Sequence, residues 1–320
     1  MGNANTKDAK TKSRQVKRAE QRKLDKKTVL DLKKGIRAKR FKRTGGRFYG
    51  PVENDIFHQT ANPLKPSWTT VASIQSSNGL QDWYKTNGKW ADIIGPTSAI
   101  IGTVTHDCVD HLNRGGKVIA YSDGIDYPEG EEPIIIEDML LGYPDVRWRL
   151  IYPFPSMAIE LICKQIMSYN AFYNEHKPNI LASEVMMWHP DVPWAGTADL
   201  LVSWHSKRQN QDVYMLGDLK TGAEHDSHFT QCQAYALLAE KIYGIKISVL
   251  GVLYCTGKWR TKPTFKIKAK EIRNKAMKRN DVSKELIEKA LSLHRLWKIN
   301  QKSEQPSTPP LITKNFKLDL

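Results

Sequence analysis

Two short apolar runs, each flanked by an aspartate and separated by a polar loop, constrain the fold of this 320-residue chain most strongly. The first run follows Asp199, and the second, residues 213–216, leads into Asp218 and Lys220. The polar loop at residues 205–210 between them is typical of a β-hairpin. Side chains alternate along a strand, so Asp218 and Lys220 should lie on one face. The pattern predicts two adjacent buried strands that bring these charged side chains together.

Burial of these charges needs an explanation, because a charged group leaves water only when it is paired or binds a metal. Taken alone, Asp218 and Lys220 are explained by a simple ion pair at a strand end. A third acid, Glu184, lies in another short apolar run upstream. Three carboxylates on adjacent strands suit a hard divalent cation, which prefers oxygen ligands. A lysine beside such an ion is suited to stabilising the negative charge that develops during attack on a phosphate.

Five short motifs occur in a fixed order along the chain. They are His106 after a Gly-Thr step, Glu184, Gly196-x-x-Asp199, Asp218-x-Lys220 and Gln231-x-x-x-Tyr235. This series resembles the successive motifs of the PD-(D/E)XK nuclease superfamily, in its RecB-like branch of small phage-type nucleases. The similarity spans roughly residues 64–256, which is most of the chain.

The resemblance implies an α/β fold with a restriction-endonuclease-like core, in which a central mixed β-sheet is flanked by α-helices. It also implies one Mg²⁺ or Mn²⁺ ion, bound by His106, Glu184, Asp199, Asp218 and the carbonyl of Leu219. The catalytic residues would be Glu184, Asp199, Asp218 and Lys220. In that scheme Lys220 orients or helps to deprotonate the attacking water.

Gln231 and Tyr235 are four residues apart in a region with helical periodicity, so they should lie on one surface of a helix. The resemblance implies that both border the site, where Gln231 would steer Lys220 or a phosphate. Ordinary packing of a helix on the sheet explains the same two residues equally well.

The implied activity is hydrolysis of phosphodiester bonds by a divalent-metal-dependent DNA exonuclease, in phage replication or recombination. Its partners would be DNA, as single strands or duplex ends, and a replication or recombination protein. Two alternatives stay open: a structure-specific endonuclease, and a non-catalytic nucleic-acid-binding protein that retains the fold. A helicase or NTPase is disfavoured because the sequence contains no Gly-x-x-x-x-Gly-Lys-Ser/Thr phosphate-binding loop.

The net charge of +15 is concentrated near the N-terminus, where residues 1–43 contain 17 Lys or Arg and four Asp or Glu. A segment so rich in charge cannot bury enough surface to offset its ordering entropy, so residues 1–46 are predicted to be a disordered basic tail. This tail is predicted to bind nucleic acid through phosphate contacts. The residues concerned are Arg37, Lys39, Arg40, Lys42 and Arg43. A solvated tail that only improves solubility is the alternative.

The rest of the chain divides into a nuclease domain, residues 47–300, and a flexible tail, residues 301–320. Apolar periodicity predicts helices over residues 96–114, 156–176 and 228–243, and a charged helix over roughly 269–300. Residues 115–155 are rich in Gly, Pro and acids and are predicted to form an irregular insertion.

Several classes of protein are disfavoured by composition. The four cysteines show no Cys-x-x-Cys spacing and only Cys255 follows the core, so no disulfide frame, zinc site or iron–sulfur cluster is expected. No apolar run approaches the roughly 20 residues of a membrane span, and no signal-peptide pattern is present. We therefore expect no membrane association and a reducing, cytoplasmic location.

Overall fold

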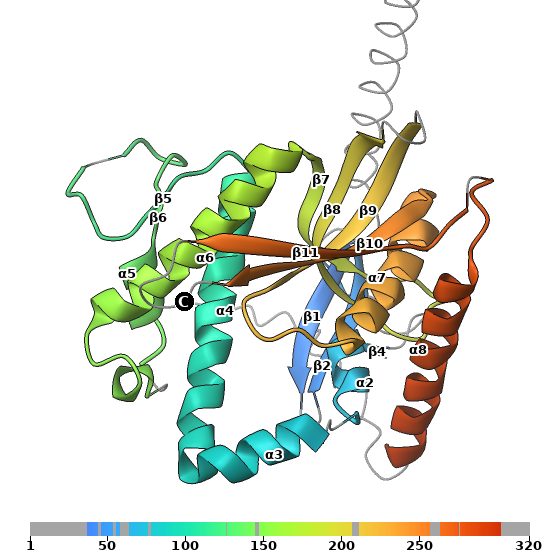
Figure 1. Cartoon of the computed structure of the whole chain (residues 1–320), viewed down its shortest axis with the longest axis horizontal. Coiled ribbons are helices and arrows are strands. Elements are labelled where there is room, and N and C mark those ends of the chain that lie inside the picture. The colour runs from blue at the N-terminus through green and yellow to red at the C-terminus, as the bar shows by residue number, and fades with distance from the viewer. Residues whose placement is uncertain are drawn as a thin grey trace, which may run out of the picture.

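A five-stranded sheet with the order β11-β10-β9-β8-β7 lies at the centre of the computed structural model (Figure 1). Its strands are β7 (Asn179–Met187), β8 (Gly196–Ser206), β9 (Gln211–Lys220), β10 (Ile247–Thr256) and β11 (Thr264–Glu271). Strands β9 and β10 are parallel, and the other neighbours are antiparallel. The prediction of an α/β protein with a central mixed sheet flanked by helices is therefore confirmed.

The structure describes residues 37–43, 46–53, 56–57, 64–75, 78–125, 127–144, 147–206, 211–256, 263–274 and 276–301. Within this part of the chain, the predicted hairpin is present as β8 and β9, which pair from Ser206 and Gln211 to Leu200 and Gly217. The three strands that contain Glu184, Asp199 and Asp218 are neighbours, as the motif order predicts.

Helices cover both faces of the sheet (Figure 1). Helices α4 (Ala91–Asn113) and α6 (Pro155–His176) pack on one face, while α7 (Ser227–Tyr243) and α8 (Asp281–Asn300) pack on the other. Leu200 and Val202 of β8 belong to the core beneath α4 and α6, whereas Leu201 belongs to the core beneath α7. Burial on both faces explains why β8 and β9 read as continuous apolar runs rather than alternating ones.

The predicted helices over residues 96–114, 156–176 and 228–243 correspond to α4, α6 and α7. The charged helix predicted over 269–300 is wrong in its first third, because β11 extends to Glu271 and α8 begins only at Asp281. In β11, Phe265 and Ile267 alternate with lysines and pair with β10, and this period of two favours a strand. Asn280 then caps α8, because its side chain accepts a hydrogen bond from Ser283 N.

The predicted disordered tail is also wrong over part of its length. Residues 37–43 form strand β1 (Arg37–Arg43), which pairs antiparallel with β2 (Gly46–Glu53) along its whole length. Ala38 of β1 is buried with Tyr49, Trp188 and Ala195, so tertiary contacts supply the apolar burial that the segment lacks by itself. Residues 1–36 of the predicted tail lie outside the described residues, as do residues 302–320 of the predicted C-terminal tail.

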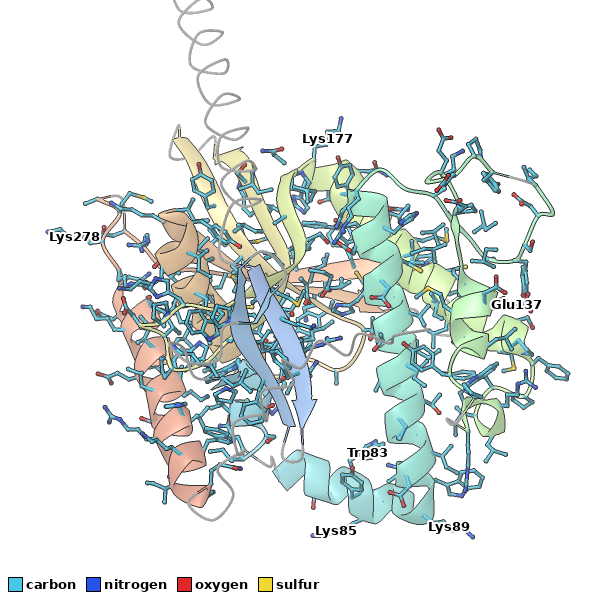
Figure 2. The ribbon with its side chains drawn as sticks, turned by 180° about the vertical axis from the view of Figure 1, so that it is seen from behind. Trp83, Lys85, Lys89, Glu137, Lys177 and Lys278 are labelled. Carbon is cyan, nitrogen blue, oxygen red and sulfur yellow. The ribbon has the colours of Figure 1, made fainter. Side chains whose placement is uncertain are left out.

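Short elements complete the fold. Strands β3 (Ile56–Phe57) and β4 (Lys65–Pro66) join β2, and α2 (Trp68–Ala72) follows with Ser67 as its cap. Helix α3 (Asn78–Asn87) and the 3-10 turn η1 (Gly88–Trp90) lead into α4 at the end marked by Trp83 in Figure 2. Among the described residues, none of the helices has the length and apolar character that a membrane crossing requires.

The insertion predicted to be irregular contains regular structure as well as loops. Its elements are β5 (Val118–Ile119), β6 (Ile134–Ile135), α5 (Ile136–Leu141) and the 3-10 turn η2 (Trp148–Leu150). Buried Ile136, Leu140 and Trp148 pack against α4 and α6 in a separate hydrophobic cluster. The insertion therefore covers the outer side of these two helices and helps to hold α4 in place.

Candidate metal centre

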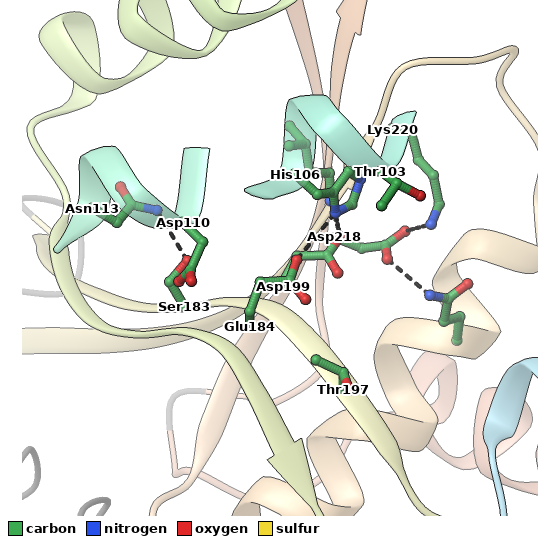
Figure 3. Close-up of polar contacts among 12 residues, drawn as sticks. Thr103, His106, Asp110, Asn113, Ser183, Glu184, Thr197, Asp199, Asp218 and Lys220 are labelled. Carbon is green, nitrogen blue, oxygen red and sulfur yellow. Dashed lines mark hydrogen bonds and ion pairs between the residues drawn. The ribbon is translucent and has the colours of Figure 1, made fainter. Parts of the chain in front are cut away.

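Three side chains from three different elements converge at the centre of the sheet (Figure 3). His106 of α4, Glu184 of β7 and Asp199 of β8 each offer a ligand atom, and these atoms lie within 4.8 Å of one another. His106 Nδ1 lies 3.1 Å from Glu184 Oε1 and 3.6 Å from Asp199 Oδ2. Residues 78 positions apart in the sequence are thus in direct contact.

Asp199 owes its position to the point where β8 and β9 stop pairing. The ladder between these strands ends at Leu200 and Gly217. Beyond it, Asp199 Oδ2 accepts a hydrogen bond of 2.7 Å from the backbone N–H of Leu219. A backbone donor that lacks a strand partner must be satisfied in another way. The carboxylate is therefore fixed by the same divergence of strands that opens room around it.

Glu184 has an unusual backbone conformation for a strand residue, with φ of 46°. A residue other than glycine in this left-handed region costs of order 1–3 kcal/mol and persists only where surrounding structure imposes it. Here the neighbouring residues Ser183 and Val185 are both paired with β8, at Leu200 and Ala198. Such strained positions cluster at functional sites, so the conformation is a second indication that Glu184 is placed for chemistry.

Asp218 lies beside this cluster, but both of its oxygens already have partners (Figure 3). It is 1% exposed, Oδ2 lies 2.7 Å from Lys220 Nζ, and Oδ1 accepts a hydrogen bond of 2.9 Å from Gln231 Nε2. Burial raises the pKa of Asp218 to about 6, against the influence of Lys220. Burial would lower the pKa of Lys220, but the charge of Asp218 outweighs it and raises that pKa.

The five predicted metal ligands are thus placed unequally. His106, Glu184 and Asp199 come together, whereas Asp218 is paired with Lys220 and Gln231. The contact of Leu219 with the cluster is made through its N–H to Asp199. All four predicted catalytic residues lie in this one region of the sheet, as Figure 3 shows.

The two predicted site-bordering residues of α7 have different surroundings. Gln231 contacts the site directly, although its partner is Asp218 and not Lys220. Tyr235 is buried, and its ring occupies the space where a Cβ atom on Gly196 would lie, 2.4 Å away. Packing therefore accounts for Tyr235, and it also explains why the motif that ends in Asp199 begins with a glycine.

A polar network that the sequence analysis missed holds α4 against the sheet. Asn113 accepts a hydrogen bond of 2.6 Å from the hydroxyl of Tyr169 in α6, and it donates one of 3.2 Å to Ser183 of β7. Asn113 follows His106 by seven residues, which is two helical turns, so both lie on one face of α4. This spacing of polar residues along an otherwise apolar stripe was the signal available in the sequence.

The predicted nucleic-acid-binding residues lie on β1. Lys39 and Arg40 are exposed, and Arg37, Lys42 and Arg43 belong to the same strand. Burial raises the pKa of Asp107 of α4, and the charges of His106 and Arg40 partly offset that effect. Arg40 therefore lies near the helix turn that carries His106, so β1 brings basic side chains to the surroundings of the cluster.

The donor set fits a hard divalent cation. Two carboxylates and one imidazole are ligands that Mg²⁺ and especially Mn²⁺ accept in proteins. Burial opposes protonation of His106, but the carboxylates of Asp199 and Glu184 outweigh burial and raise its pKa to about 9. A proton and a divalent cation therefore favour the same negatively charged position.

Comparison with known proteins gives no independent identification of this arrangement. No protein-family model matches the sequence, and no curated protein matches it significantly. The geometry of His106, Glu184 and Asp199, with Lys220 close by, is accordingly the basis for assigning a function.

Proposed function

We propose that this protein is a divalent-metal-dependent DNA exonuclease built on a restriction-endonuclease-like core, acting in phage replication or recombination. One observation carries the proposal: three candidate ligand atoms lie within 4.8 Å of one another beside the paired Asp218 and Lys220. A simple ion pair explains Asp218 and Lys220 alone, but it does not explain a second, separate group of two carboxylates and an imidazole.

His106, Glu184 and Asp199 would hold one Mg²⁺ or Mn²⁺ ion. Such an ion, when bound, polarises a phosphoryl oxygen and lowers the pKa of water at the site. The Lys220 ammonium, held 2.7 Å from Asp218, supplies a fixed positive charge and hydrogen-bond donors for a phosphate or for the attacking water. Gln231 holds Asp218 from the other side, so the Lys220 head group is oriented by two residues in series.

Exposed basic residues on β1 support a polyanionic substrate. Lys39 and Arg40 lie on a strand near the turn of α4 that carries His106. Lysine and arginine side chains bind nucleic acid mainly by neutralising phosphates. The same observation is compatible with a non-catalytic nucleic-acid-binding protein, which the experiment below distinguishes.

The test is degradation of labelled oligonucleotides with Mg²⁺, Mn²⁺ or Ca²⁺. Single- and double-stranded DNA and RNA, labelled at the 5′ or the 3′ end, report the substrate class and the direction of cutting from product sizes. We expect Asp199→Asn and Lys220→Ala each to reduce cleavage by about 100-fold or more, because each removes a group that acts on the developing charge.

Asp191→Asn is the matched control, because Asp191 is an exposed acid paired with Lys241 away from the cluster. Calorimetry should show Mn²⁺ binding lost in Asp199→Asn and retained in Lys220→Ala, since lysine is not a ligand. Internal cuts without end dependence would indicate an endonuclease. Wild-type protein that binds DNA, binds neither metal and cuts nothing would leave the non-catalytic binding protein as the correct reading.

A further inference from the structure

A histidine outside the recognised motifs lies beside the lysine of the candidate site. His228 is in the first turn of α7, three residues before Gln231, so both side chains project from one face of the helix. Gln231 contacts Asp218. The charges of Lys220 and Asp218 both act on His228, so its imidazole is a neighbour of this pair.

The orientation of His228 is fixed by Tyr254 of β10. His228 Nδ1 lies 3.0 Å from the hydroxyl oxygen of Tyr254, which is 2% exposed. The same hydroxyl oxygen accepts a hydrogen bond from the backbone N–H of His225. Since that N–H can only donate, the hydroxyl proton of Tyr254 is free to be donated to His228 Nδ1. The ring hydrogen of His228 then lies on Nε2.

His228 is therefore a neutral donor rather than a cation. Burial and the nearby Lys220 ammonium lower its pKa to about 4. Its Nε2 has no hydrogen-bond partner among the residues that the structure describes, in contrast to Nδ1. A half-buried donor fixed at one nitrogen and unpaired at the other, next to a lysine, is suited to an anionic oxygen.

We propose that His228 binds a phosphodiester oxygen of the nucleic acid strand through its Nε2–H, and that Tyr254 holds it in the tautomer that does so. This proposal rests on the proposed function and adds a substrate contact to it. The neutral imidazole adds a directed hydrogen bond next to Lys220 without placing a second positive charge there.

The experiment compares His228→Ala, His228→Gln and His228→Asn with the wild type. Cleavage of a labelled DNA strand with Mn²⁺ gives kcat and KM, and fluorescence anisotropy in EDTA gives the affinity without metal. Loss of a hydrogen bond to a charged group should reduce kcat/KM by about 10- to 100-fold in His228→Ala. His228→Gln should recover most of this loss because its amide nitrogen extends about as far as Nε2, whereas Asn should not.

Two further variants separate a substrate contact from a general structural effect. His225→Ala removes an exposed imidazole whose ring lies 6.0 Å from that of His228, and it should leave kcat/KM unchanged. Tyr254→Phe should weaken cleavage by less than His228→Ala, and it should have no further effect when combined with it.

The outcomes distinguish failure of this proposal from failure of the proposed function. Wild-type cleavage with equal kcat/KM in His228→Ala would overturn the His228 contact and leave the nuclease standing. Absence of wild-type cleavage would overturn the nuclease, and the anisotropy would then decide the contact. Weaker binding in His228→Ala with recovery in His228→Gln would support it, and unchanged binding would refute it.

Discussion

At the scale of single residues, Glu184 combines a strained backbone with a role in the candidate metal centre. Its φ of 46° is one that glycine adopts without cost, whereas other residues do not. Its side chain nevertheless lies 3.1 Å from His106. The backbone cost and the carboxylate position thus occur at the same residue, as expected where stability is sacrificed for a site.

We predict that Glu184→Gly leaves the free energy of unfolding unchanged or raises it, because relief of strain offsets the lost contact with His106. Ala182→Gly, two residues earlier in β7, should instead lower it by about 0.5–1 kcal/mol, the usual cost of glycine in a strand. Urea unfolding in EDTA measures both values. Equal destabilisation by the two substitutions would show that Glu184 stores no strain.

His228 also makes a prediction about stability and pH. Its pKa is near 6.5 in an unfolded chain and about 4 in the folded one, where it faces Lys220, Asp218, His225 and Tyr254. Between these values the unfolded state binds more protons, so stability falls as the pH decreases from 6.5 to 4. The contribution is fully present above pH 6.5.

We therefore expect wild type to lose more stability than His228→Gln between pH 7 and pH 5, by on the order of 2 kcal/mol at most. Urea midpoints of the two proteins across this range provide the measurement. Parallel pH profiles for the two proteins would show that His228 is protonated as readily in the folded state as in the unfolded state.

At the scale of elements, the position of α4 determines whether a metal centre exists. Two of the three ligands are on adjacent strands, but His106 reaches them only because α4 packs across the sheet. Asn113 fixes that packing through Tyr169 of α6 and Ser183 of β7. Gly102 adds to it, because a Cβ atom there would lie 3.3 Å from Thr221 Oγ1.

We predict that Asn113→Ala lowers the free energy of unfolding by about 1–3 kcal/mol, because it leaves the Tyr169 hydroxyl buried without its acceptor. Tyr169→Phe should cost less, and the double variant should cost less than the sum of the two. Affinity for Mn²⁺, measured by calorimetry, should fall in Asn113→Ala. Unchanged affinity despite the stability loss would show that α4 keeps its position without this network.

At the scale of the whole molecule, the basic N-terminal region divides into two parts with different roles. Residues 1–36 contain twelve Lys or Arg and four Asp or Glu, whereas β1 adds five Lys or Arg within the fold. Because Ala38 is buried with Tyr49, Trp188 and Ala195, β1 belongs to the folded part of the chain.

We predict that deletion of residues 1–36 preserves folding and lowers the slope of log affinity for DNA against log salt, at about 0.9 per lost phosphate contact on duplex. Deletion of residues 1–43 should also lower the free energy of unfolding, because it removes β1 from its pairing with β2. Thermal unfolding and a salt titration of DNA binding test both. An unaltered salt slope in the shorter deletion would remove residues 1–36 from the DNA contact.

The sequence by itself determined the elements that contain the site and their order. Apolar runs and the loop at residues 205–210 specified the β8–β9 hairpin, and periodicity specified α4, α6 and α7. Alternation along β9 placed Asp218 and Lys220 on one face, and the structure shows them 2.7 Å apart. These features are local, because side-chain direction follows from backbone geometry within a few residues.

Only the tertiary structure decided which of these residues meet. It brought His106 to Glu184 and Asp199, paired Asp218 with Lys220 and Gln231, and gave Glu184 a left-handed backbone. It also made β1 a strand, although its composition predicts disorder, by burying Ala38 against distant residues. The physical reason is that a periodic pattern specifies which face of an element is buried, while the neighbour on that face depends on packing between elements distant in the sequence.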